Sequence, residues 1–137
     1  MSSQSRSAST FLVVDDDSIF HFLMIKMLTR LGVLPEGIRT ASTGREALER
    51  VVEAQLTGKP QPDYILLDLN MPIMGGFAFL EACKKLPEKL PDRVKMIIIS
   101  SSLDKRDVNR AAELGASHYL VKPVTEADLE FILNVPV

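Results

Sequence analysis

The sequence predicts an α/β fold in which a doubly wound, five-stranded parallel sheet is covered by five helices. Five short apolar runs alternate with longer segments that repeat apolar residues at helical spacing. Four of the runs are apolar at nearly every position, as expected of parallel strands that are buried on both faces, and the run at residues 38–41 is a weaker candidate. Polar and turn residues flank each run and separate it from the helical segment that follows. A run and the helical segment after it therefore form one repeating unit.

Each apolar run is a predicted strand, and each following segment is a predicted helix. The runs span residues 11–14, 38–41, 64–67, 96–99 and 119–121. The first helix carries an apolar stripe formed by Phe20, Leu23, Met24, Met27, Leu28 and Leu31. Comparable stripes follow the other strands, the last over about residues 125–134. Gly32, Gly58 and Gly115 follow three of the stripes, at the place where a glycine commonly ends a helix.

Length and composition fit one domain and exclude several kinds of protein. With 137 residues, 46% of them apolar and 25% charged, the chain can bury a single core. We expect the Ser-rich residues 1–10 to form a disordered tail and residues 11–137 to form one domain. A net charge of -2, without a stripe of basic and aromatic residues, gives no sign that this domain binds nucleic acid.

Membrane and secretory signals are missing from the sequence. No stretch approaches the roughly 20 apolar residues that cross a bilayer. The apolar run at residues 11–14 is too short for a signal peptide. The single Cys83 cannot form an internal disulfide. These features predict a cytoplasmic protein that does not bind membranes.

The residues that could carry chemistry directly follow the predicted strands. They are, in chain order, Asp15, Asp16, Asp17, Asp68, Ser100, Ser101, Ser102 and Lys122. Because the carboxyl ends of parallel strands meet at one edge of a sheet, we expect these side chains to converge. Taken alone, each has an ordinary explanation: Asp17 or Ser18 could cap a helix, and a Ser-rich run could be a loop. Their conjunction at four strand ends favours a shared site.

The types of side chain at these strand ends favour a divalent cation and phosphate. Clustered carboxylates are tolerated together mainly when a cation offsets their repulsion. Oxygen ligands suit Mg²⁺, with Mn²⁺ as the alternative, and no His or Cys follows these strands at a spacing that suits zinc. Phosphoryl transfer needs in-line positioning and neutralised oxygens, and a carboxylate can itself form an aspartyl phosphate. The pattern predicts a protein that accepts and holds a phosphoryl group.

Four segments together resemble the receiver domains of two-component response regulators. They are residues 11–18, 67–76, 97–101 and 115–123, with the signatures Asp-x-Asn-Met-Pro-x-Met-x-Gly and Tyr-x-x-Lys-Pro. The resemblance implies a flavodoxin-like (βα)5 fold similar to that of the bacterial chemotaxis response regulator. It also implies a signalling protein rather than an enzyme. Such a protein takes phosphate from a histidine kinase or a histidine phosphotransfer protein and then switches its binding to a downstream protein.

The resemblance implies a role for each acid of the site. Asp68 matches the phosphorylated aspartate. Asp15 and Asp16 match the acidic pair that holds Mg²⁺ together with it, and Asn70 would complete the metal site through its backbone carbonyl. Lys122 matches the lysine that contacts the phosphoryl group.

The resemblance also implies which residues move and which control water. Ser100 and Tyr119 match the switch pair, whose aromatic member changes rotamer as the hydroxyl moves toward the phosphoryl group. Asn70 and Ser102 flank the path of the attacking water, and both are small and polar, which predicts a phosphate lifetime of minutes rather than days. Pro123 matches a position that is usually a cis proline.

Ile19, Phe22 and Ile25 lie outside the core stripe of the first predicted helix. One interpretation is a helix that is simply more buried than usual. The other is a docking patch for the phosphodonor, because this helix is the usual donor surface in the family and apolar patches favour partners.

Three other functions share parts of this pattern. A flavodoxin-like module that binds a flavin phosphate would need a Ser-, Thr- or Gly-rich loop where this chain has three aspartates. A hydrolase with an aspartyl nucleophile would carry that acid after the first strand rather than the third. A pseudo-receiver that cannot take phosphate would lack part of the set that is complete here, namely Asp15, Asp16, Asp68, Ser100 and Lys122.

Overall fold

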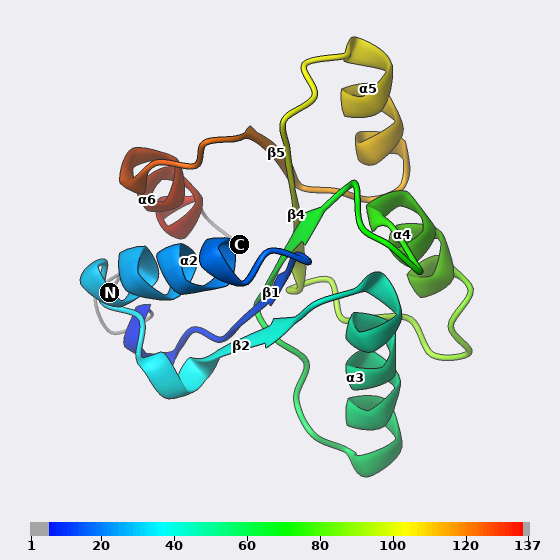
Figure 1. Cartoon of the computed structure of the whole chain (residues 1–137). Coiled ribbons are helices and arrows are strands. Elements are labelled where there is room, and N and C mark those ends of the chain that lie inside the picture. The colour runs from blue at the N-terminus through cyan, green and yellow to red at the C-terminus, as the bar shows by residue number, and fades with distance from the viewer. Residues whose placement is uncertain (1–5, 136–137) are drawn as a thin grey trace.

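Five parallel strands form one sheet at the centre of the protein (Figure 1). The computed structural model describes residues 6–135. The strands are β1 (Phe11–Val14), β2 (Ile38–Ala41), β3 (Tyr64–Asp68), β4 (Lys95–Ser100) and β5 (His118–Val121). Their order in the sheet is β2-β1-β3-β4-β5. All five predicted strands are present, and three of them extend by one or two residues into their polar flanks.

Five α-helices follow the five strands, as predicted. They are α2 (Ser18–Arg30), α3 (Gly44–Thr57), α4 (Gly76–Lys84), α5 (Lys105–Glu113) and α6 (Glu126–Asn134). The structure adds a 3-10 turn, η1 (Pro35–Gly37), and a helical stretch at residues 6–8, so it has more helical segments than the sequence predicts. Residues 1–5 of the predicted disordered tail lie outside the described residues, and the disorder stays a prediction.

Arg6 attaches the first described residues to the domain. Its guanidinium forms an ion pair with Glu130 of α6 and donates a hydrogen bond to the side-chain oxygen of Asn134 at 2.8 Å. It also donates to the carbonyl oxygen of Leu31, just after α2, at 3.2 Å. This contact ties the chain ahead of β1 to both helices.

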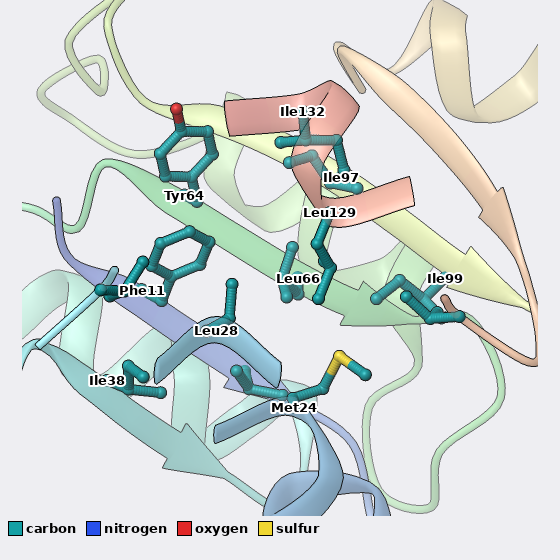
Figure 2. Packing of buried hydrophobic residues seen from close by; sticks show 13 residues of the cluster. Phe11, Met24, Leu28, Ile38, Tyr64, Leu66, Ile97, Ile99, Leu129 and Ile132 are labelled. Carbon is teal, nitrogen blue, oxygen red and sulfur yellow. The ribbon is translucent and has the colours of Figure 1, made fainter. Parts of the chain in front are cut away.

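Helices cover both faces of the sheet and divide the core into two clusters. Helices α2 and α6 pack on one face, and α3, α4 and α5 pack on the other (Figure 1). In β1, Phe11 and Val13 belong to the first cluster, and Leu12 and Val14 belong to the second. The first cluster also contains Met24, Leu28, Tyr64, Leu66, Ile97, Leu129 and Ile132 (Figure 2). Burial on both faces explains why β1, β3 and β4 carry no polar alternation.

Helix α2 differs from its predicted stripe at two residues. Met24 and Leu28 are buried as expected, but Leu23 is 46% exposed. Ile25, which was predicted to lie outside the stripe, is half-buried and packs against the core. The helix is apolar around most of its circumference, so spacing alone does not fix which side faces the sheet.

The strand order reverses next to β1, with β2 on one side of it and β3 on the other. In a doubly wound sheet, ligands bind outside the carboxyl ends of the strands at such a reversal. The fold therefore directs attention to the residues just after β1 and β3. Within residues 6–135, no helix has both the length and the apolar character needed to cross a membrane.

Candidate functional site

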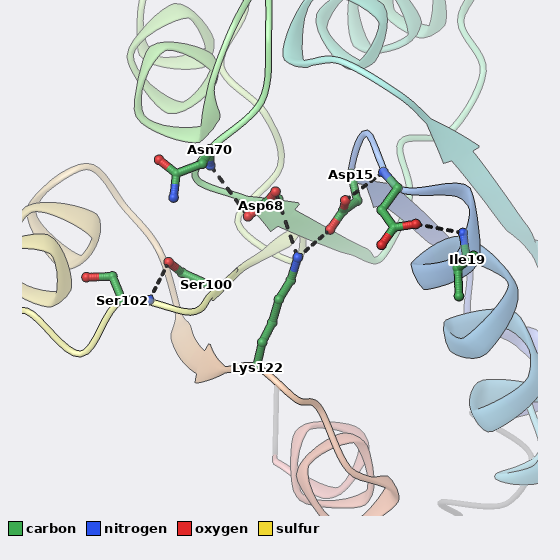
Figure 3. A network of polar contacts seen from close by, with 8 residues as sticks. Asp15, Ile19, Asp68, Asn70, Ser100, Ser102 and Lys122 are labelled. Atoms are coloured by element: carbon green, nitrogen blue, oxygen red, sulfur yellow. Dashed lines mark hydrogen bonds and ion pairs between the residues drawn. The ribbon is translucent and has the colours of Figure 1, made fainter.

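Four strand ends meet at one edge of the sheet (Figure 3). Asp15 follows β1, Asp68 ends β3, Ser100 ends β4 and Lys122 follows β5. The parallel pairing of β1 with β3 continues up to the residue before each acid, so the two carboxylates lie side by side. Figure 3 shows the side chains of Asp15, Asp68 and Lys122 pointing toward one another.

Asp15, Asp16 and Asp68 form the acidic side of the site. Each offers a carboxylate oxygen within 4.8 Å of the other two. Asp15 and Asp68 are buried, whereas Asp16 is exposed. Burial raises the pKa of Asp68, and the negative charge of Asp15 raises it further. An all-oxygen group that is partly open to water fits a hard divalent cation, which would offset the repulsion between the acids.

The backbone after β1 is held in place by the aspartates themselves. The Asp17 N–H donates to the Oδ1 atom of Asp15 at 2.9 Å, and the Ile19 N–H donates to the Oδ1 atom of Asp17 at 2.9 Å. Asp17, rather than Ser18, is therefore the N-cap of α2. This arrangement uses one oxygen of Asp15 and leaves the other facing the site.

Lys122 joins the acids from the end of β5. Its ammonium donates to the Oδ2 atom of Asp15 at 2.9 Å and lies 3.9 Å from the Oδ2 atom of Asp68. The ammonium also lies 4.6 Å from the centroid of the Phe20 ring, on α2. Burial lowers the pKa of Lys122, but the hydrogen bond and charge of Asp15 and the charge of Asp68 outweigh it, and the pKa is raised. The peptide bond to Pro123 is cis.

Asn70 lies beside Asp68 in the loop between β3 and α4. Its backbone N–H donates a long hydrogen bond to the Oδ1 atom of Asp68, at 3.4 Å. Two glycines let this loop fold back closely on the strand end. A Cβ atom on Gly76 would come within 2.6 Å of the Asp68 carbonyl oxygen, and one on Gly75 within 2.7 Å of the Leu69 carbonyl oxygen. Glycine at both positions therefore keeps Asn70 next to Asp68.

The hydroxyl side of the site is built around Ser102. The Ser102 N–H donates to the buried Oγ atom of Ser100 at 3.0 Å, and the Tyr119 hydroxyl donates to the Ser102 carbonyl oxygen at 3.0 Å. The Ser102 hydroxyl donates to the Oδ2 atom of Asp107, on α5, at 2.7 Å and accepts from the Asp104 N–H at 3.1 Å. One residue thus connects the predicted switch pair to α5.

Sequence reasoning misses two residues of this region, Phe20 and Asp107. Phe20 falls on the apolar stripe of α2, and an aromatic residue at helical spacing indicates a core position. Asp107 is one acidic residue among several polar residues on α5, and no motif distinguishes it. Both contacts depend on how the helices are placed on the sheet, which local spacing does not determine.

The predicted docking patch on α2 is only partly exposed. Ile19 is 67% exposed and Phe22 is 62% exposed. Ile25 packs against the core instead, and Leu23 joins the exposed apolar surface. The exposed apolar surface of α2 therefore consists of Ile19, Phe22 and Leu23.

Comparisons with known proteins agree with this geometry. The family model of the response regulator receiver domain matches residues 11–134. A probable chemotaxis protein CheY of Rhizobium etli is 34% identical over 115 residues, which cover 83% of this chain and 81% of that protein. The crystal structure of a two-component response regulator from Cytophaga hutchinsonii superposes with a TM-score of 0.81 at 27% identity, over 92% of this chain and 94% of the other.

A longer relative contains a similar segment. A protein-glutamate methylesterase/protein-glutamine glutaminase of Archaeoglobus fulgidus is 37% identical over 112 residues, or 82% of this chain. The chain spans 29% of the length of that relative. The similarity therefore covers one part of the longer protein.

Proposed function

This chain belongs to the response regulator receiver family of two-component signalling, and on that premise we propose that Asp68 accepts a phosphoryl group in a Mg²⁺-dependent reaction. One observation carries the proposal: three acids from two strand ends each place a carboxylate oxygen within 4.8 Å of the other two, and an ammonium from a third strand end lies against two of them. Residues that only form turns do not require acids and an ammonium at one place. A carboxylate nucleophile with a metal site and a phosphate ligand does require this arrangement.

The acidic side fits a resident Mg²⁺ ion, with Mn²⁺ as the alternative. Asp15, Asp16 and Asp68 would hold it through their carboxylates, and Asn70 through its backbone carbonyl. The pKa of Asp68 is raised first by burial and then by the charge of Asp15, and a bound cation would offset that charge. When bound, the ion neutralises charge on the phosphoryl oxygens.

Asp68 would act as the nucleophile. One of its carboxylate oxygens forms a bond to phosphorus while the bond between phosphorus and the donor's imidazole nitrogen breaks, and the electron pair of that bond stays on the nitrogen. Lys122, already 3.9 Å from Asp68, would contact a phosphoryl oxygen. The Ser100 hydroxyl accepts from the Ser102 N–H in this structure, and its own proton can be donated to the phosphoryl group at the same time.

The hydroxyl side would transmit the change to a downstream protein. In the proposed switch, Ser100 moves toward the phosphoryl group and Tyr119 follows it. Both are bonded to Ser102, so a movement of either displaces the loop that leads to α5. Asn70 and Ser102 would also set the phosphate lifetime. Replacing Ser102 with Arg should change the rate of phosphate loss, and an unchanged rate would exclude a gating role at that position.

The donor would be a histidine kinase or a histidine phosphotransfer protein that docks on α2. Ile19 and Phe22 are exposed there, a few residues from the acidic side. Replacing Phe22 with Glu should slow transfer from a protein donor while leaving transfer from acetyl phosphate unchanged. In this proposal the domain signals by binding and is not itself an enzyme.

Incubation with acetyl phosphate and Mg²⁺, followed by intact mass, tests the proposed function. We expect a mass gain of one phosphoryl group that disappears with EDTA and with Asp68→Asn. Asp104→Asn, which replaces an exposed carboxylate at the start of α5, is the matched control and should label normally. Labelling of Asp68→Asn at the normal rate would contradict the assignment. A folded wild-type protein that never labels would be a pseudo-receiver, and a flavin absorption band would identify a flavin-binding module.

A further inference from the structure

Helix α5 is held in place by less burial than the other α-helices that cover the sheet. Its one buried residue, in a helix that the structure describes in full, is Ala111, whereas α2, α3, α4 and α6 each bury two or three residues. An alanine side chain removes little apolar surface from water, so its burial contributes little to holding the helix. The position of α5 beside α4 must therefore depend on polar contacts (Figure 1).

Two polar contacts lie about one turn apart on the side of α5 that faces the protein. Asp107 accepts the hydrogen bond from the Ser102 hydroxyl. One turn later, the Arg110 guanidinium forms a salt bridge with the carboxylate of Glu81, on α4, at 3.0 Å, and its central carbon lies 4.4 Å from the centroid of the Phe77 ring. Phe77 and Glu81 are four residues apart on α4, so they lie on one side of that helix. A planar guanidinium can stack on the ring and pair with the carboxylate at the same time.

Helix α4 is fixed to the strand that carries Asp68. The N–H of Gly76, the first residue of α4, donates to the Leu69 carbonyl oxygen at 3.0 Å. The start of the helix also lies so close to the Asp68 carbonyl oxygen that a Cβ atom on Gly76 would clash with it. Helix α5, by contrast, follows the loop that contains Ser102, which the proposed switch displaces. Arg110 therefore joins a helix that the switch would move to a helix that stays with the site.

We propose that Arg110 is a latch that holds α5 against α4 in the unphosphorylated domain, and that this latch opens when α5 is displaced. Movement of α5 away from α4 would separate the guanidinium from the Phe77 ring and from the Glu81 carboxylate. These contacts favour the undisplaced position, so phosphorylation has to overcome them. The side chains of Arg110 and Glu81 are 52% and 46% exposed, and a salt bridge this exposed is weak enough to be broken by a moderate change elsewhere. The contact exists without phosphate, but its regulatory role rests on the proposed function.

Hydrogen exchange in the unphosphorylated protein tests the latch itself. Arg110→Ala should speed exchange of the α5 amides about three- to tenfold, while the amides of α4 stay within about twofold of wild type. Arg106→Ala is the matched control, because Arg106 lies on the same helix but forms its salt bridge with Asp104, at the start of α5. This control replaces an arginine with the same good helix former and should leave α5 within about twofold of wild type. Unchanged exchange in Arg110→Ala, an equal effect of Arg106→Ala, or faster exchange throughout the domain would each overturn the latch.

A double-variant cycle tests whether Arg110 acts through α4. Glu81→Ala alone should also speed exchange in α5, because it removes the acceptor of the guanidinium. In an Arg110→Ala background, Glu81→Ala should have no further effect on α5, since the contact is already lost. If Glu81→Ala speeds exchange in α5 by the same factor with and without Arg110, the two side chains act independently and the proposed latch is wrong.

The regulatory role is tested by repeating the exchange measurement with Mg²⁺ and an excess of acetyl phosphate. Phosphorylation should speed exchange in wild-type α5, and it should do so by a smaller factor in Arg110→Ala, where the latch is already open. Equal factors in the two proteins would overturn the regulatory role. Arg110→Ala should also keep its full effect in an Asp68→Asn background without phosphate. A protein that never takes phosphate would therefore contradict the proposed function while leaving the α4–α5 latch in place.

Discussion

The two sides of Asp68 hold their geometry by different forces. On the acidic side, the ammonium of Lys122 lies between the carboxylates of Asp15 and Asp68, so the contacts are charged. On the hydroxyl side, Ser100 and Tyr119 are both hydrogen-bonded to the backbone of one residue, and those contacts are neutral. Charged contacts respond to cations, salt and pH, whereas neutral ones do not. In the proposed function, the acidic side would bind phosphate, and the hydroxyl side would displace α5.

The largest expected effect comes from removing the ammonium on the acidic side. Lys122→Ala should slow labelling by acetyl phosphate on the order of 100-fold, since a charged donor to the phosphoryl oxygens is lost. Tyr119→Phe, on the hydroxyl side, should change the labelling rate by less than about threefold, because its hydroxyl donates to the backbone carbonyl oxygen of Ser102. Lys105→Ala, at the start of α5, controls for loss of a lysine. If Lys122→Ala and Tyr119→Phe slow labelling equally, the acidic and hydroxyl sides do not differ in their contribution to phosphate binding.

The hydroxyl side should show its effect on α5 instead. Asp107→Ala removes the acceptor of the Ser102 hydroxyl and should lower the free energy of unfolding by about 1–2 kcal/mol. Hydrogen exchange should become faster in α5, while labelling by acetyl phosphate stays near the wild-type rate. Asn109→Ala, on the same helix, is the control for a polar side chain removed from α5. If Asp107→Ala slows labelling but leaves hydrogen exchange in α5 unchanged, Asp107 acts on the phosphate site rather than on α5.

The acidic side could be predicted from the sequence because it depends on topology alone. Asp15 and Asp68 stand at strand ends, and parallel strands that alternate with helices must bring such ends to one edge. Lys122 follows by the same reasoning. The side chains need no particular helix orientation to reach one another, so a sequence pattern is enough to place them.

Other features depend on helix rotation or on tertiary strain, and the sequence does not predict them. Phe20 reaches Lys122 because α2 is rotated so that Leu23 faces water and Ile25 faces the core. Nothing in a helix that is apolar on most sides fixes that rotation. Ile73, in the loop between β3 and α4, is harder still, because its φ is +72°, whereas local preference assigns a β-branched residue to extended backbone. The closure of the loop overrides that preference.

A smaller effect follows from the raised pKa of Asp68. A carboxyl group whose pKa is higher in the folded state than in the unfolded state destabilises the fold once it is ionised. Asp68→Asn should therefore raise the free energy of unfolding at neutral pH on the order of 1 kcal/mol. The gain should disappear as the pH falls below the folded-state pKa, where wild-type Asp68 is neutral as well.

Urea denaturation of both proteins, from neutral to acidic pH, measures this difference. Mg²⁺ should stabilise the wild-type protein and have little effect on Asp68→Asn. Asp104→Asn should have the opposite sign at neutral pH, because a side-chain hydrogen bond from Arg106 lowers the pKa of Asp104. If the wild-type protein and Asp68→Asn have the same free energy of unfolding at neutral pH in the absence of Mg²⁺, the ionised acids do not destabilise the fold.

The smallest effect, at Phe20, tests whether the acidic side is held by charge alone. The Phe20 ring faces the ammonium of Lys122, and such a contact contributes about 0.5–1 kcal/mol. Phe20→Leu keeps an apolar side chain but removes the ring, and labelling should slow by about two- to fivefold. Phe20→Tyr keeps the ring and should preserve the rate.

Two further measurements separate positioning by Phe20 from a general loss of packing. The ε-methylene protons of Lys122 should move downfield in the NMR spectrum of Phe20→Leu before any phosphate is added, because the aromatic ring current that shields them is gone. In a Lys122→Ala background, Phe20→Leu should no longer affect labelling, since the ring then has no ammonium to hold. If Phe20→Leu slows labelling equally with and without Lys122, the ring acts through the core, and the acidic side owes its geometry to the carboxylates alone.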